Sequence, residues 1–473
     1  MSSKLDLKSF AIATLVPIVM MLVAMWIKPL WRDEFFSLYY SEPGLSLPDL
    51  AENRWVIDAH PPLHNIFLWV WSHISEHVFW QKALSLVFLG IGAFACFQLS
   101  PTSRRRTLYI FGLTCLGSYW VIYFATEIRP YILNFTLSTV LTLAAVRLIE
   151  DEQANWPLWT IWIVTGALLS LTHYFGALWF ACLGLMVGIH HLTRGQNSRF
   201  FRIGSLTVLG LVPALLWIKF ALTQIDLSNV TSDLTALQKL QGGLHQFLRG
   251  LLVKTFGSNP LITILGFGGI LAAIFGRNYR NRVLLGAAGL MLLIALVLHI
   301  ALADMIKERA FISMMPAVLY IFADHIADKE SSWMKYIPLA AVIMPFLFIP
   351  EYFKNKERID EFQAALNSYG PACETAAIPV LLRPDPPRAF YEFAAQKIVS
   401  PDGKRQLAPL DISQTFELAS DCPVVAVSVL LPKNSAAIID LGNTHLMRLG
   451  QDPSKLEVRR FGKGRNIFWV RRP

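Results

Sequence analysis

The residues best suited to chemistry in this chain are charged side chains placed beside long apolar segments. Asp33 and Glu34 lie in WRDEFFSLYY, directly after the first apolar run, and Asp58 and His60 lie in DAHPPLHN. A carboxylate can act as a general base, and a histidine can bind an anion or transfer a proton. An uncompensated charge in hydrocarbon costs at least ~2.5–3.5 kcal/mol, so these positions indicate a functional site.

A second group of such residues interrupts an apolar stretch. YFATEIRPYI places Glu127, Arg129 and Tyr131 around Pro130. Because proline restricts the residue before it to extended backbone, we predict that a helix ends here. In a continuous helix the side chains of Glu127 and Arg129 would point about 200° apart, whereas a helix break lets both face one cavity.

Two further stretches carry polar side chains at the ends of apolar runs. THYFG contains His173 and Tyr174, and DMIKERAF contains Lys307, Glu308 and Arg309. If all these groups share one face of the membrane, they form a site for an anionic group together with a base.

Each group also has an ordinary structural interpretation, and the sequence leaves it open. These interpretations are a solvated helix end for Asp33 and Glu34, a structural ion pair for Glu127 and Arg129, a core histidine for His173, and side chains that reach interfacial water for Lys307 and Arg309. The functional interpretation instead depends on all these residues lying on the same side of the membrane.

The apolar segments that position these residues are long enough to cross a membrane. The chain has 473 residues, of which 54% are hydrophobic and 16% charged, so it is predicted to be an α-helical polytopic membrane protein. Runs of about 17–22 apolar residues cross a hydrocarbon core of roughly 30 Å. We predict about eleven spans, near residues 10–28, 80–99, 108–125, 131–149, 157–173, 176–191, 204–222, 260–276, 283–303, 310–326 and 334–350.

The orientation of these spans follows from lysine and arginine in the short loops. PTSRRRT, TRGQNSRFFR and GRNYRNR fall on one side, which is predicted to be cytoplasmic together with the N-terminus. The first run lacks a cleavage site and is expected to remain as an anchor. The protein is therefore expected to be a multi-pass protein of a bacterial inner membrane, and its net charge of +9, partly due to loop arginines, does not predict nucleic-acid binding.

Two domains are predicted. Residues 1–350 form a transmembrane domain whose outward loop, 29–79, contains interfacial helices; His64, His73 and His77 are expected on their surface. Residues 351–473 form a small periplasmic α/β domain, in which AAIPVLLR, CPVVAVSVLL and NIFWVRR read as buried strands. Its position suggests an accessory role in recognising an acceptor or partner.

The cysteines divide between these regions. Cys96, Cys115 and Cys182 lie in apolar runs and are expected to be packing residues. Cys373 and Cys422 are the two in the tail and could pair in an oxidising compartment. Sequence does not supply the proximity that a disulfide needs, so their pairing stays open.

These motifs resemble those of the GT-C glycosyltransferases. WRDEFFSLYY followed by DAHPPLH looks like the first loop of the protein O-mannosyltransferase type, a group that includes bacterial aminoarabinose and galacturonic acid transferases acting on lipopolysaccharide. EIRPY, THYFG and KERAFISMMP are similar to further stretches, although Ala310 and Phe311 stand where an aromatic residue is more usual. The resemblance covers residues 10 to 350, and its most specific part is the acidic pair with D-x-H-P-P-L.

The resemblance implies transfer of a sugar, with inversion, from a polyprenyl-phosphate donor to an acceptor hydroxyl on the outer face. Asp33 would be the base, and Asp58 a second base or a group that orients the acceptor. Arg129, Lys307 and Arg309 would stabilise the charge of the leaving phosphate. The other expected substrate-binding residues are Glu34, His60, Glu127, Tyr131, His173 and Tyr174.

No cofactor is predicted, because the family is generally nucleotide-independent and the chain has no Walker-type loop. Asp58, His60 and His173 could also ligate a divalent cation, but three unlinked ligands are weak evidence, so no metal is predicted. The expected partners are the lipid-linked donor, an acceptor that is an envelope lipid such as lipopolysaccharide, another glycan or a protein, and membrane lipids.

Two other classes of function remain. A transporter or flippase of a lipid-linked saccharide would also need a polar cavity among spans, but it would tend to show internal symmetry, and no repeat is evident. A receptor-like protein would instead carry its function in the tail.

Overall fold

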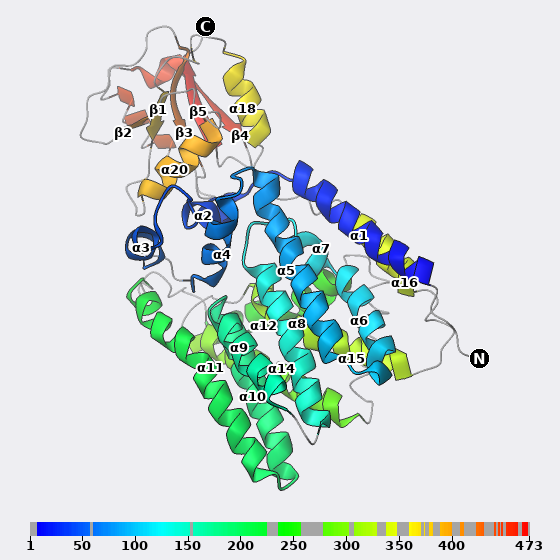
Figure 1. Ribbon diagram of the computed structural model, residues 1–473. Helices are drawn as coiled ribbons and strands as arrows, with labels where there is room; N and C mark the ends of the chain where they lie inside the picture. Colours follow the sequence, from blue (N-terminus) through cyan, green and yellow to red (C-terminus); the bar gives the residue numbers. More distant parts are fainter. Residues whose placement is uncertain are drawn as a thin grey trace. The chain divides into compact units, whose positions relative to one another are not determined.

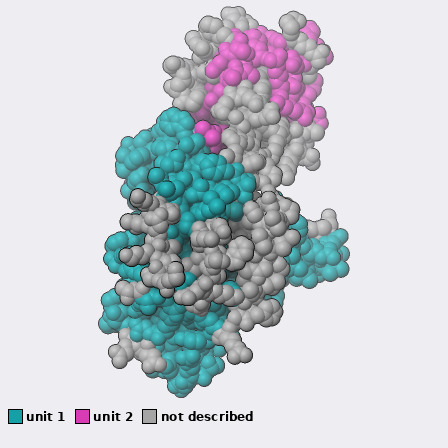
Figure 2. All heavy atoms as spheres, turned by 90° about the vertical axis from the view of Figure 1, so that its right-hand side faces the viewer, with its two compact units in different colours: residues 1–26, 40–351 teal, residues 27–39, 352–473 magenta. Residues whose placement is uncertain are grey.

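The computed structural model forms two compact units, which Figure 2 colours separately: residues 1–26 with 40–351, and residues 27–39 with 352–473. The structure describes residues 7–56, 60–151, 155–224, 235–256, 278–301, 307–328, 337–347, 359–369, 373, 378–381, 388–399, 407–410, 422–429, 439–440, 443–444, 446–447, 451–461 and 466–471.

The first unit is helical (Figure 1). Its helices are α1 (Leu7–Ile27), α3 (Leu47–Leu50), the π-helix η1 (Ala51–Trp55), α4 (Leu63–Ser72), α5 (Val78–Leu99), the 3-10 helix η2 (Thr102–Arg104), α6 (Arg105–Leu116), α7 (Tyr119–Phe124), α8 (Tyr131–Glu150), α9 (Trp156–Ser170), α10 (Tyr174–Thr193), α11 (Asn197–Gln224), α12 (Ala236–Phe256), α14 (Tyr279–Ala301), the 3-10 helix η3 (Glu308–Ser313), α15 (Met315–Asp328) and α16 (Ile337–Leu347).

Among the described residues, five helices are long and apolar enough to cross a membrane, namely α5, α8, α10, the Asn197–Lys219 part of α11, and α14. A sixth is added if α1 and the short helix after it count as one broken span, and α9 and α15 are apolar but shorter. The predicted run 108–125 is divided into α6 and α7, where the Ser118 hydroxyl donates to the Cys115 carbonyl oxygen at 2.8 Å. The predicted run 260–276 lies outside the described residues.

Helix α8 forms the centre of this unit. About 89% of its most apolar 18-residue stretch is buried, and the helix packs against α5, α9, α10 and α15. Neighbouring helices approach closely at small residues: a Cβ on Gly166 of α9 would lie 2.2 Å from the ring of Phe180 on α10. Substitution of this glycine would therefore force the Phe180 ring, or the two helices, to shift.

At the end of α8 that carries Glu150, four charged side chains form a network. Asp324 of α15 is fully buried and accepts from Arg280 at 3.0 Å and from Arg104 at 3.3 Å. Glu150 pairs with Arg104 at 2.7 Å and also with Arg280. The side-chain amides of two asparagines, Asn278 and Asn281, also donate to Asp324. The network joins η2, α8, α14 and α15, and it was not predicted from the sequence.

The second unit contains a five-stranded sheet in the order β2-β1-β3-β5-β4. Strand β1 is parallel to β2 and β3, whereas β5 is antiparallel to β3 and β4. The elements are α2 (Arg32–Tyr39), α18 (Ile359–Asn367), β1 (Ile378–Leu381), α20 (Arg388–Val399), β2 (Leu407–Leu410), β3 (Val424–Ser428), the 3-10 helix η5 (Pro453–Lys455), β4 (Leu456–Phe461) and β5 (Asn466–Arg471). The three apolar stretches predicted as strands are β1, β3 and β5, which confirms a small α/β fold.

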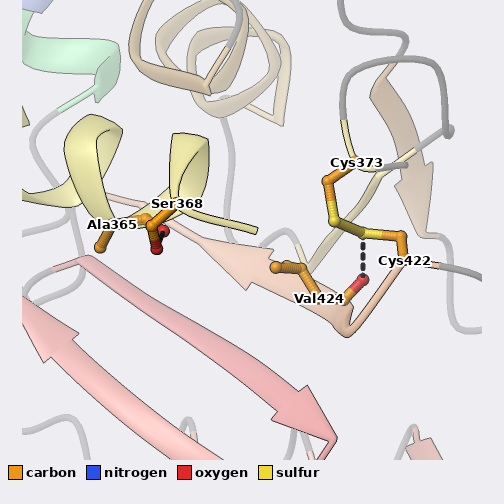
Figure 3. The surroundings of a disulfide bond; sticks show 5 residues. All are labelled: Ala365, Ser368, Cys373, Cys422 and Val424. Carbon is orange, nitrogen blue, oxygen red and sulfur yellow. Dashed lines mark hydrogen bonds between the residues drawn. A yellow bond between two sulfur atoms is a disulfide. The ribbon is translucent and has the colours of Figure 1, made fainter. Parts of the chain in front are cut away.

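A core of buried apolar residues holds this sheet together, and one disulfide joins the segments that precede β1 and β3. Val425, Ile467 and Trp469 are buried in the core. Cys373 and Cys422, 49 residues apart, form the disulfide, which lies beside β3 (Figure 3). The structure thus contains the pairing that the sequence left open. Closing a loop of this length restricts the unfolded chain and stabilises the fold by about 2–4 kcal/mol.

Candidate active site

The break predicted within YFATEIRPYI is present. Helix α7 ends at Phe124, and α8 begins at Tyr131 with Pro130 as its N-cap. In the turn between them the Glu127 side chain is fully buried and Arg129 is half-buried. A charged turn at the end of a central helix is the feature on which the candidate site is built.

Tyr131 brings two cations together. The guanidinium carbon Cζ of Arg129 lies 5.7 Å from the centre of the Tyr131 ring, and Cζ of Arg309 lies 5.8 Å from it. Both distances are in the range of cation–π attraction. Both guanidinium groups therefore lie beside one ring, where their positive charges favour an anion nearby.

Arg309 is positioned by the short helix η3. The Ser313 hydroxyl at the end of η3 donates to Asn134 Oδ1 of α8 at 2.8 Å. The Phe311 ring lies 5.2 Å from the ring of Phe247 on α12. These contacts hold the predicted basic segment against two helices, whereas Lys307, just before η3, is exposed.

His173 lies in the turn between α9 and α10, outside both helices, and caps α10. Its Nδ1 accepts a hydrogen bond from the backbone N–H of Phe175 at 3.2 Å. A neutral imidazole that accepts at Nδ1 carries its proton on Nε2. His173 can therefore donate a hydrogen bond from Nε2. The ring of His60 lies 5.8 Å from the His173 ring, centre to centre.

The segment that contains His60 is fixed by backbone contacts. The His60 carbonyl oxygen accepts from Trp217 Nε1 at 3.1 Å. The backbone N–H of Leu63 donates to the carbonyl oxygen of Leu171 at 3.2 Å, which joins this segment to the turn before His173. Two motifs more than a hundred residues apart are thus brought side by side.

These residues form one cluster, because the charged members affect the pKa of the histidines. Burial, followed by electrostatic interaction with His60, Arg129 and Arg309, lowers the pKa of His173 to about 3. Burial also lowers the pKa of His64 to about 3, with Arg129 as the next cause. Both imidazoles are therefore neutral at pH 7.

The placement of His64 corrects an expectation. It was predicted to be a surface residue of an interfacial helix, but its side chain is only 5% exposed. His64, Leu68 and Ser72 recur at helical spacing and form the buried face of α4. This periodicity was the signal in the sequence that it belongs to the interior. His73 and His77 are exposed as expected.

The candidate base is carried by α2, in the second unit. Asp33 is half-buried, and Glu34 is fully buried with Oε2 accepting from the backbone N–H of Trp31 at 3.0 Å. Glu34 thus satisfies a donor at the start of the helix, a role close to that of an N-terminal cap.

The remaining predicted residues are placed as follows. Tyr174 is the first residue of α10 and is half-buried. Asp58 lies outside the described residues. Within the part of the chain that the structure describes, no three His, Cys, Asp or Glu side chains gather in a way that could hold a metal ion.

An apolar cavity lies near the cation cluster in the first unit. It has a volume of about 560 Å³ and is lined by residues of α1, α5, α6, α7 and α8. Arg105 lies on its wall toward one end of the helices, and Val121 and Phe135 lie toward the other. Phe135 is about one helical turn from Tyr131 along α8, so the cavity reaches the neighbourhood of the cations.

Comparisons with known proteins identify the fold. No protein-family model matches the chain, and no curated protein matches it in sequence. Among solved structures it is similar to ArnT from Cupriavidus metallidurans bound to undecaprenyl phosphate, with 13% identity, 97% of each chain covered and a TM-score of 0.54. It is also similar to the apo state of that ArnT, with 14% identity, the same coverage and a TM-score of 0.56.

This likeness extends over nearly the whole chain and includes both the apolar helices and the C-terminal sheet. It agrees with the fold that the motifs predicted. The chain therefore has the GT-C fold of the ArnT structures.

Proposed function

We propose that the protein is a membrane glycosyltransferase that moves a sugar from a polyprenyl-phosphate donor to an acceptor hydroxyl. The observation that carries this proposal is the pair of guanidinium groups around Tyr131, with neutral His173 beside them. The GT-C fold supports it, since a similarly folded ArnT binds undecaprenyl phosphate.

The cations suit a leaving phosphate. When the glycosidic bond breaks, its electron pair stays on the phosphate oxygen, and negative charge increases there. Arg129 and Arg309 are held by the fold before the reaction, so they can stabilise this charge without reorganising. The Nε2–H of His173 supplies an uncharged donor, Lys307 a further cation, and His60 and Tyr174 a polar border to the same cluster.

The apolar cavity suits the isoprenoid part of the donor. Its lining is almost entirely apolar, and Phe135 is close along α8 to Tyr131. A lipid phosphate needs an apolar groove for its chain and cationic side chains near the end of that groove. This arrangement offers both.

The acceptor hydroxyl needs a base, and Asp33 is our candidate, with Asp58 as the second. In one displacement with inversion, the acceptor oxygen attacks the anomeric carbon, the bond to the phosphate oxygen breaks, and the acceptor proton passes to the carboxylate. The assignment of Asp33 rests on its motif in the first loop. Glu127 then holds Arg129 or binds a sugar hydroxyl.

The proposed setting is a bacterial inner membrane with the reaction on the periplasmic face. The charges of the short loops support it. The acceptor is an envelope lipid such as lipopolysaccharide, another envelope glycan or a protein. The accessory unit is proposed to be periplasmic, where its disulfide would persist.

The test is sugar transfer in proteoliposomes with a panel of polyprenyl-phosphate sugars and extracted envelope lipids. We expect the wild type to transfer sugar and Asp33→Asn to lose at least about a hundredfold in rate, the usual scale for a general base. The matched control is Arg202→Gln, which removes an exposed cation on α11, away from the cluster. Translocation without transfer, unaffected by Asp33→Asn, would instead identify a flippase.

A further inference from the structure

A contact within the second unit bears on the orientation of Asp33. Helix α2, from the N-terminal part of the chain, packs against α20, about 350 residues later (Figure 1). The rings of Phe36 and Phe390 stack with their centres 3.7 Å apart and their planes 4° apart. The Tyr39 ring lies 5.8 Å from the Phe390 ring and 5.7 Å from that of Phe393.

The contact extends along one face of α2. Arg32 Nη2 donates to the hydroxyl oxygen of Tyr391 at 3.4 Å. Arg32, Phe36 and Tyr39 are spaced at i, i+4 and i+7, so they share one face of the helix. Asp33 follows Arg32 by one position and therefore points about 100° around the axis from that face. The direction of the Asp33 carboxylate therefore depends on how α2 is rotated about its own axis.

Helix α2 cannot hold this rotation by itself. It has eight residues, and isolated helices of that length are unstable in water. Its apolar stripe is aromatic, and its partner Phe390 is fully buried. The docking on α20 thus supplies the stability that the helix lacks.

Helix α20 is itself fixed to the sheet domain. Ala394 and Ile398 are buried, and Gln363 Nε2 of α18 donates to the carbonyl oxygen of Ile398 at 2.9 Å. The helix also packs against β2. It therefore forms a rigid support, from the C-terminal domain, for the helix that carries the acids.

We propose that α20 positions the acid-bearing helix, with Phe390 as the positioning residue for Asp33. The C-terminal domain then takes part in the reaction by directing the base, beyond any role in recognition. This inference rests on the proposed function, in which Asp33 is the base. Catalysis is sensitive to such placement, since a displacement of about 1 Å can cost a hundredfold in rate.

A double-mutant cycle on kcat tests the contact. Phe36→Ala and Phe390→Ala should each lower kcat about tenfold, and the double variant should lose about tenfold rather than a hundredfold, because both remove one interaction. The KM for the donor should change less than about twofold, since the proposed phosphate ligands lie in the other unit. Phe36→Tyr, which keeps the stacked ring at the half-buried partner, should retain wild-type kcat.

The matched control is Tyr369→Ala, which removes an aromatic side chain after α18 that stacks with Arg459. It perturbs the same domain at a site other than the α2 contact, so kcat should remain at the wild-type value. Additive losses in the cycle, or a Phe390→Ala protein with unchanged kcat, would overturn the proposal.

Hydrogen exchange gives a readout that does not depend on activity. In the full protein in nanodiscs, Phe390→Ala should speed exchange of the α2 amides, whereas Tyr369→Ala should not. Unchanged protection of α2 in Phe390→Ala overturns the inference. If the wild type transfers no sugar, the proposed function fails and the inference fails with it. If transfer occurs and depends on Asp33 but not on Phe390, the inference alone fails.

Discussion

Arg129 and Arg309, 180 positions apart in the sequence, lie with their guanidinium carbons 5.7 and 5.8 Å from the centre of one ring, that of Tyr131. In the proposed function, this pairing binds the phosphate of the donor at the end of α8.

The first prediction concerns these two cations. Arg129→Gln and Arg309→Gln should each lower kcat for transfer about 10²–10³-fold, because each removes a fixed positive charge from the leaving phosphate. Tyr131→Phe should be nearly silent, since the ring remains. The rates are measured at saturating donor in proteoliposomes. A loss of less than threefold in both arginine variants would contradict the assignment.

The second prediction concerns pH. The pKa of His173 is about 3 in the native protein and 6.5 ordinarily, so the unfolded chain binds more protons between these values. Stability should therefore be greatest above pH 6.5 and decrease as the pH is lowered toward 3. His64 acts in the same direction. The thermal midpoint in detergent, compared at pH 7 and pH 4.5, measures the effect.

A matched pair of variants isolates the contribution of His173. His173→Asn keeps a side chain that can cap α10, and it should show a weaker dependence of the midpoint on pH. His73→Asn changes an exposed histidine and should behave as the wild type. Equal pH dependence in all three proteins would argue against a half-buried His173 that is neutral in the native protein.

The third prediction concerns the charged network at the Glu150 end of α8. Asp324→Ala leaves Arg280, whose side chain is 4% exposed, without its buried partner, and should lower stability by about 3–5 kcal/mol. Asp151→Ala removes the half-exposed i,i+4 partner of Arg147 and should cost about 0.3–0.5 kcal/mol. Unfolding in nanodiscs distinguishes the two. Similar small losses would show that the network contributes little.

The fourth prediction concerns the apolar cavity. Gly112 lines it, and a Cβ there would meet no atom within 4 Å, so Gly112→Phe can fill the space without displacing the backbone. We expect KM to rise about tenfold for a long-chain polyprenyl-phosphate sugar, because the ring occupies the space of the chain, and to change little for a short-chain analogue.

The control for the cavity is Gly289→Phe on α14, where the glycine is exposed and a Cβ also meets open space. That variant should leave KM unchanged for both donors. If Gly112→Phe affects neither donor, the isoprenoid chain binds elsewhere.

Local features of this protein were determined by its sequence. Pro130 disfavours helical backbone at the residue before it, so the break beside Glu127 and Arg129 was predictable from the sequence. The apolar runs and the buried strands of the tail likewise follow from composition, and the motifs indicated the GT-C fold that the ArnT structures confirm.

Contacts between distant segments were decided only by the tertiary structure. The burial of His64 depends on which face of α4 packs inward, and the pairing of Cys373 with Cys422 depends on how the strands are ordered. The docking of α2 on α20 joins segments about 350 residues apart through aromatic rings. The sequence of neither segment indicates that the two would pack together. Many apolar residues of the chain are chemically similar, so the sequence of one segment does not identify its packing partner. The partner is determined by shape and burial in the complete fold.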